Sequence, residues 1–136
     1  MDNKEKVLSL YRFENALSTL EIAEMCVEKK HYRDSINRCY YAVFYAIKSV
    51  LALEEVDFKR HKDVVAYFNK KYVATEIFPK DIGRKLGNLK TAREENDYDD
   101  FVFASVDEAE TQMENTKYIV NSVKKYLKDK EVIKDE

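Results

Sequence analysis

The chain has 136 residues, with 24 Lys and Arg against 26 Asp and Glu and a formal net charge of -2. This balance argues against nucleic-acid binding by bulk electrostatics, because phosphate contacts need clustered Lys and Arg. Only 2 Gly and 1 Pro are present, too few for the turns of a sandwich or barrel, so the composition favours long helices. The length suits one domain with a single core.

Apolar residues recur with a helical period in five segments, which predicts an all-α antiparallel up-and-down bundle of about five helices. The first helix is expected over about residues 4–29. Its predicted inward row consists of Leu10, Phe13, Leu17, Leu20, Ala23 and Val27.

The second helix, about residues 32–54, contains the most strongly patterned apolar run, from Ile36 to Leu51. We expect one side of it to be buried and the rest of the bundle to be arranged around it. That inward side consists of Ile36, Tyr40, Val43, Phe44, Ile47 and Leu51. A row of small residues beside the polar side, where another helix could approach closely, consists of Ser35, Cys39, Ala42, Ala46 and Ser49. The polar side carries Asp34, Arg38, Tyr41 and Tyr45.

The third helix is expected over about residues 61–73 and the fourth over about 80–96, directly after Pro79. Gly83 and Gly87 lie one turn apart in the fourth helix, and close packing is the interpretation we favour for both. A last helix from about residue 106 closes a domain of residues 1–128, and the charged tail of residues 129–136 is expected to fray.

Few residues suggest metal, redox or membrane chemistry. Glu28 and His31 form one Glu-x-x-His pair, but it falls at a predicted helix break, so we expect no metal site and no cofactor. Cys26 and Cys39 fit no metal spacing and are expected to be reduced thiols. The N-terminus has no leader pattern and no apolar run is long enough to span a membrane. A cytoplasmic protein is the resulting expectation.

Two side chains stand out against their surroundings. Arg93 follows Ile82, Leu86 and Leu89 at the same helical phase, so a guanidinium points where an apolar group is expected. It is either half of a structural ion pair, with Asp97, Asp99 and Asp100 as candidate partners, or a phosphate-binding cation in a cleft. His61 lies on the apolar face of the third helix and is either a neutral core histidine or a functional one.

Three separated segments resemble one family. NRCYYAVFYAIKSVL is similar to the Arg-x-Tyr-Tyr-Ala-x-Phe helix of the small stand-alone HEPN proteins of bacteria and archaea, and KRHKDVVAYF to their following His-Lys helix. FPKDIGRKLGNLKTAREENDYDDF resembles their Phe-Pro-Lys stretch, which ends in Arg and then Asp-Tyr. The three segments occur in the family's order, and the resemblance extends from about the first predicted helix to the last, nearly the whole chain.

This resemblance implies a helical bundle, commonly a homodimer, whose relatives bind nucleotides or cleave RNA. Many relatives also pair with a minimal nucleotidyltransferase, often as toxin and antitoxin. The positions that match the family's recurring polar residues are Arg38, Tyr41, His61, Arg93, Asp97 and Tyr98. The wider family's ribonuclease signature, an Arg followed after four to six residues by His, is absent from this sequence.

Three hypotheses follow. The leading one is a dimeric module that binds a nucleotide or RNA near Arg93, with Arg38, Tyr41, Asp97 and Tyr98 as binding residues, and that works with a nucleotidyltransferase partner. The second is a metal-independent ribonuclease toxin that uses Arg93 and His61. The third is a purely structural dimerisation domain.

Overall fold

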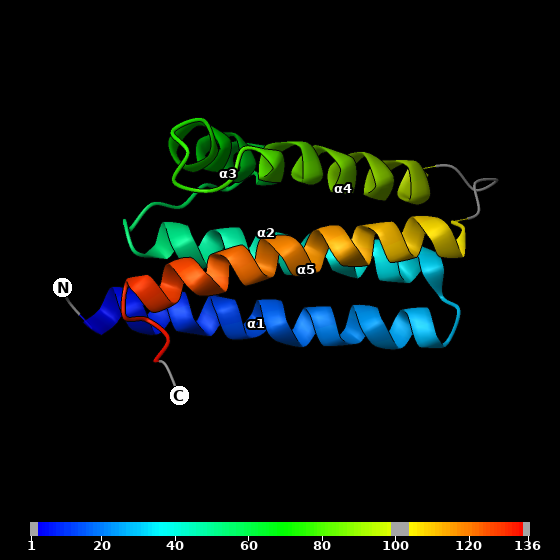
Figure 1. Cartoon of the computed structure of the whole chain (residues 1–136), viewed down its shortest axis with the longest axis horizontal. Helices are drawn as coiled ribbons and strands as arrows, with labels where there is room; N and C mark the ends of the chain where they lie inside the picture. Colours follow the sequence, from blue (N-terminus) through cyan, green and yellow to red (C-terminus); the bar gives the residue numbers. More distant parts are fainter. Residues whose placement is uncertain (1–2, 99–103, 135–136) are drawn as a thin grey trace.

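The computed structural model describes the backbone of residues 3–98 and 104–134 and the side chains of residues 4–95 and 104–134. Within these ranges the regular secondary structure is entirely helical. The elements are α1 (Asn3–Glu28), α2 (Tyr32–Ala52), α3 (His61–Phe68), the π-helix η1 (Asn69–Val73), α4 (Asp81–Tyr98) and α5 (Val106–Asp129). The long helices alternate in direction (Figure 1), which confirms the predicted all-α up-and-down bundle.

Helix α2 is the centre of this bundle. It packs against α1, α3, α4 and α5, and in Figure 1 it lies between α1 on one side and the α3–α4 pair on the other. Its predicted inward residues are all buried, namely Ile36, Tyr40, Val43, Phe44, Ile47 and Leu51. The amphipathic period of the sequence therefore identified the central helix correctly.

The contact between α1 and α2 is made by small residues. Fully buried small residues recur every seven positions on both helices, as Ser9, Ala16 and Ala23 on α1 and as Ser35, Ala42 and Ser49 on α2. Ser9 Oγ donates a hydrogen bond to Ser49 O at 2.7 Å, and Ser35 Oγ donates to Ala23 O at 3.1 Å. The antiparallel register set by these two bonds places Ala16 opposite Ala42. The close approach predicted for the small-residue row is confirmed, and α1 is the helix that approaches.

The predicted inward row of α1 is wrong at two positions. Leu10 and Leu17 are 37% and 43% exposed, whereas the other four predicted residues are buried or partly buried. The true inward side includes Ser9 and Ala16, both fully buried. Small side chains give a weak hydrophobic signal, so the period in the sequence was fitted to the larger leucines on the neighbouring face.

The segment predicted as the third helix changes hydrogen-bonding pattern along its length. Helix α3 covers only eight residues, and η1 continues it to Val73. Glu54, just beyond α2, holds this segment in place, because its carboxylate accepts hydrogen bonds from Tyr67 Oη at 3.2 Å and from Lys71 Nζ and Tyr72 Oη. Burial alone would raise the pKa of Glu54, but the Lys71 and Tyr72 bonds lower it below its ordinary value.

The two glycines of α4 have different surroundings. A Cβ at Gly83 would lie 3.5 Å from Val73 Cγ1, an ordinary packing distance, whereas a Cβ at Gly87 would meet nothing within 4 Å. The prediction that both glycines serve close packing is therefore wrong for Gly87, which is exposed.

Helix α5 begins with a serine side-chain cap and ends in a packed turn. Ser105 Oγ accepts a hydrogen bond from Glu108 N at 3.1 Å, the arrangement expected of Ser-x-x-Glu. Of the tail expected to fray, residues 130–134 are described beyond α5, and Val132 and Ile133 pack against the core there. Among the described residues no helix combines the length and apolar character needed to cross a bilayer.

Candidate functional site

Arg93 ends the apolar row of α4 and faces two tyrosines of α2. The row begins with buried Ile82, Leu86 and Leu89. The Arg93 guanidinium carbon lies 4.8 Å from the centroid of the Tyr40 ring and 5.3 Å from that of Tyr41. Its Nη2 donates a hydrogen bond to Tyr41 Oη at 3.2 Å. Stacking on aromatic rings is a favourable position for a planar cation that is half-buried. The side chains of the suggested acidic partners, Asp97, Asp99 and Asp100, lie outside the described residues.

His61 approaches the same tyrosines from α3, of which it is the first residue. Its ring centroid lies 4.0 Å from Phe44, 5.8 Å from Tyr41 and 6.3 Å from Tyr40. Burial lowers the pKa of His61 below its usual 6.5, and the positive charges of Arg93 and Lys48 lower it further. The imidazole is therefore neutral at pH 7 and has one nitrogen that accepts a proton or a hydrogen bond.

We call these five side chains, Tyr40, Tyr41, Phe44, His61 and Arg93, the Arg93–His61 cluster. They come from α2, α3 and α4, so the fold brings together residues up to 53 positions apart in the sequence, Tyr40 and Arg93. The two residues predicted as a tentative catalytic pair, Arg93 and His61, both contact the Tyr41 ring. Tyr41, His61 and Arg93 are partly exposed, so solvent reaches part of the cluster.

The positions of the other predicted binding residues are defined in less detail. Arg38 is exposed on α2, about one turn before Tyr41, and it belongs to the same polar side of that helix. Asp97 and Tyr98 lie in the last turn of α4, but their side chains fall outside the described residues.

Sequence reasoning missed Lys48, which adds a second cation beside His61. Its Nζ lies 5.7 Å from the centroid of the Phe44 ring and 3.4 Å from Asp57 Oδ1. Lys48 follows Tyr41 by seven residues, or two helical turns, and this spacing was the signal available in the sequence. Tyr45 continues the aromatic surface, with its ring centroid 6.5 Å from that of Tyr41.

Cations, aromatic rings and a neutral imidazole together suit a ligand that carries both phosphate and a planar base. A guanidinium binds phosphate oxygens through two parallel hydrogen bonds. An exposed aromatic ring provides a stacking surface for a base of any identity. Such contacts are local, so they are compatible with the chain's overall charge of -2.

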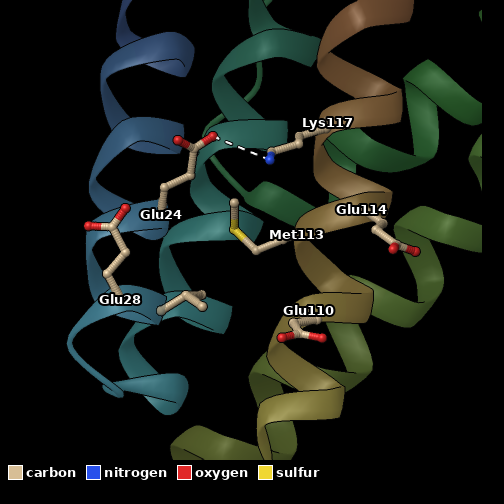
Figure 2. Close-up of a pocket in the computed structure, with 7 residues that line it drawn as sticks. Glu24, Glu28, Glu110, Met113, Glu114 and Lys117 are labelled. Carbon is tan, nitrogen blue, oxygen red and sulfur yellow. Dashed lines mark ion pairs between the residues drawn. The ribbon is translucent and has the colours of Figure 1, made fainter.

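A separate groove lies between α1 and α5 and is lined by acidic residues (Figure 2). It has a volume of about 380 Å³. Its carboxylates are Glu24, Glu28, Glu110 and Glu114, and Lys117 Nζ pairs with Glu24 at 3.6 Å. No predicted site residue lines this groove. A wall of four carboxylates repels phosphate, so the groove does not suit the ligand class that fits the Arg93–His61 cluster.

The sulfur and metal chemistry of the chain is limited. Buried Cys39 donates its thiol hydrogen to Met113 Sδ at 3.3 Å, and burial raises the pKa of Cys39 to about 11. Cys39 therefore remains a protonated thiol at neutral pH. Over the described ranges, no three His, Cys, Asp or Glu side chains gather into a group that could hold a metal ion.

Comparison with known proteins places this chain in a family. The chain matches the HEPN domain over residues 9–126. It is 25% identical to a "UPF0332 protein" of Thermotoga maritima over 95% of this chain and 97% of the relative. Two proteins of Methanocaldococcus jannaschii named "Putative toxin" are 28% and 29% identical, over 90% and 94% of this chain and 84% and 93% of theirs. Because the domain match covers most of the chain, this protein belongs to the HEPN domain family.

Proposed function

We propose that this HEPN protein binds single-stranded RNA or a nucleotide at the Arg93–His61 cluster. The observation that carries the proposal is the convergence of three partly exposed side chains, Arg93, His61 and Tyr41, from three helices. Arg93 binds a phosphate, and the rings of Tyr41 and Tyr45 stack with a base. Arg38 and Lys48 lie along the same side of α2 and bind neighbouring phosphates. Asp97 and Tyr98, at the end of α4, complete the predicted binding set.

A toxin role in the cytoplasm is the second part of the proposal. It is supported by the "Putative toxin" names of two relatives that match nearly the whole chain. The resemblance described above adds two expectations, a homodimer and a minimal nucleotidyltransferase as the antitoxin partner. A partner that covers the Arg93–His61 cluster blocks RNA from reaching it, which is a direct way to neutralise such a toxin.

A metal-independent ribonuclease activity is the alternative, and the position of His61 favours it. The neutral imidazole of His61 accepts the proton of an RNA 2′-hydroxyl as that oxygen attacks the adjacent phosphorus. Arg93 stabilises the added negative charge on the phosphate oxygens. The bond to the 5′-oxygen then breaks, and that oxygen takes a proton from water. In this alternative, His61 of α3 replaces the histidine that follows the arginine by four to six residues in the wider family's ribonuclease signature.

Binding of a labelled single-stranded RNA tests the proposal. We compare the intact protein with Arg93→Gln and with a matched control, Arg84→Gln, which removes an exposed charge from the same helix. A hydrogen bond to a charged group contributes about 1.5–3 kcal/mol, so Arg93→Gln should weaken RNA binding roughly 10- to 100-fold. The control should bind RNA with nearly the affinity of the intact protein. Equal affinities for the two variants, or no binding by the intact protein, would reject the proposed site.

The same samples distinguish an RNA-binding module from a ribonuclease. Release of RNA fragments in the presence of a chelator, lost in both Arg93→Gln and His61→Gln at unchanged thermal stability, would establish the ribonuclease. Binding without fragments would establish the module alone. A stable dimer that neither binds nor cleaves RNA would leave the purely structural alternative. Co-purification with a co-expressed nucleotidyltransferase tests the proposed partner.

A further inference from the structure

One arginine of α1 reaches two other segments of the chain. Helix α1 lies on the opposite side of α2 from the α3–α4 pair (Figure 1), and it supplies no side chain to the Arg93–His61 cluster. Arg12 of α1 nevertheless donates a hydrogen bond from Nη1 to Lys48 O of α2 at 3.1 Å. Its Nη2 donates to Oδ2 of Asp57, between α2 and α3, at 3.3 Å. The Arg12 side chain is 16% exposed, so this bridge is largely shielded from water.

Asp57 brings together donors from three segments. Lys48 Nζ lies 3.4 Å from Asp57 Oδ1, and Phe58 N donates a hydrogen bond to the same oxygen at 2.9 Å. Burial alone would raise the pKa of Asp57, but the Phe58 bond and the charges of Lys48 and Arg12 lower it below its ordinary value. The carboxylate is therefore ionised at neutral pH and pairs with both the ammonium of Lys48 and the guanidinium of Arg12.

The two residues bridged by Arg12 both bear on the cluster. Lys48 Nζ lies 5.7 Å from the centroid of the Phe44 ring, and the His61 ring packs on that ring at 4.0 Å. Asp57 precedes His61 by four residues, which span at most about 14 Å when fully extended. Because His61 is the first residue of α3, the place where Asp57 is held limits where the His61 ring can lie.

The bridge depends on the shape of the guanidinium. An arginine side chain ends in a rigid planar fork, so its N–H groups point to different acceptors at fixed positions. A lysine ammonium carries the same charge as a single point on a flexible stem. Arg12→Lys therefore keeps the charge and removes the bridge, which separates placement from electrostatics.

We infer that Arg12 is a positioning residue of the proposed RNA-binding site: it holds Asp57 and the main chain at Lys48, and thereby fixes the Lys48 ammonium and the beginning of α3 beside the cluster. The inference rests on the proposed function, because it names the residue that keeps Lys48 and His61 in place for the ligand. The competing explanation is an ion pair that only adds stability, although partly exposed pairs contribute little to it.

The pKa of His61, followed by NMR as the pH is varied, tests this placement without RNA. In Arg12→Lys the beginning of α3 should move away from Phe44, so that His61 is less buried and its pKa rises toward 6.5. Arg84→Lys is the matched control, because Arg84 is exposed on α4, and it should leave this pKa unchanged. A bridge that only stabilises the fold would lower the thermal midpoint without moving the pKa of His61.

Asp57→Asn distinguishes placement from charge by the sign of its effect. By charge alone, loss of this carboxylate would lower the pKa of His61 further and strengthen the binding of RNA, a polyanion. Loss of the anchor has the opposite effects, since it exposes His61, raises its pKa and weakens RNA binding. The inference predicts these opposite effects. A His61 pKa that stays the same or falls in either variant overturns it.

Binding of the labelled single-stranded RNA completes the test, with circular dichroism to verify the fold of each variant. Arg12→Lys should weaken RNA binding about 2- to 10-fold, comparable to the loss of one hydrogen bond, whereas Arg84→Lys should not. No RNA binding by the intact protein, with the His61 pKa raised in both variants, would reject the proposed function and support the placement by Arg12. Undiminished RNA binding by Arg12→Lys, with this pKa unchanged, would overturn the inference and leave the proposed function standing.

Discussion

Helix α2 makes two contacts of opposite character. Against α1 it presents small residues, and the helices approach closely enough for Ser9 and Ser35 to bond to the facing main chain. Against α4 it presents the Tyr40 and Tyr41 rings, on which Arg93 stacks. The first contact is fully buried and made by small residues, and the second is polar and partly exposed. One helix thus holds the bundle together along one side and presents functional groups along another.

Core truncation should have the largest effect on stability. Ile47 is fully buried on the inward side of α2, so Ile47→Ala should lower the free energy of unfolding by about 2–5 kcal/mol. Urea denaturation measures this change. Arg38→Ala, on the exposed side of the same helix, should change it by less than about 0.5 kcal/mol. Similar losses for both variants would contradict the assignment of the two sides.

Overpacking the α1–α2 contact should have the next largest effect. Ala42 lies opposite Ala16 between two fully buried serines of α2, so Ala42→Leu should destabilise the protein by about 1–3 kcal/mol. Arg38→Leu adds an apolar side chain at an exposed position of the same helix and should be nearly neutral. The denaturation midpoint measures this change. An unchanged midpoint for Ala42→Leu would show that α1 and α2 are not closely packed at this position.

In α4, one substitution should increase the stability of the protein. Gly87 is exposed, and nothing lies within 4 Å of a Cβ placed there. Gly87→Ala should therefore stabilise the protein by about 1 kcal/mol, because alanine is the better helix former. Thermal unfolding measures the shift. A loss of stability would mean that α4 packs closely at this position, as α1 does against α2.

The smallest expected effect is on the pH dependence of stability, which tests the surroundings of His61 in the Arg93–His61 cluster. Because the folded pKa of His61 lies below 6.5, the unfolded chain takes up the proton first as the pH falls. This residue's contribution to stability is therefore lost as the pH decreases from about 6.5 through the folded pKa. Denaturation at pH 7.5 and 5.5 should show a smaller loss for His61→Gln than for the intact protein. Equal losses would contradict the lowered pKa.

Sequence periodicity predicted the fold and the central helix because large apolar residues mark the inward side of α2. It assigned Leu10 and Leu17 to the wrong side of α1, because Ser9 and Ala16, which form the true contact, are too small to give a hydrophobic signal. Gly87 was misjudged because a glycine in a sequence does not show whether its surroundings are crowded or empty.

Sequence reasoning selected three of the five side chains of the Arg93–His61 cluster, but not their arrangement. The phase of Arg93 in α4 and the resemblance to the HEPN family selected Arg93, His61 and Tyr41. Their meeting depends on how α3 and α4 cross α2, which no local pattern encodes. The seven-residue spacing from Tyr41 places Lys48 on the same side of α2, but its proximity to His61 follows from the placement of α3.

The central claim is that the Arg93–His61 cluster binds a phosphate-bearing, base-bearing ligand. It is tested most directly by following the aromatic and imidazole NMR signals of the intact protein while single-stranded RNA is added. The account predicts saturable shifts for His61 and Tyr41, with smaller ones at Phe44 and Tyr45 and none at Tyr11 on the outward side of α1. Shifts confined to other parts of the protein, or none at RNA concentrations that saturate binding, would contradict it.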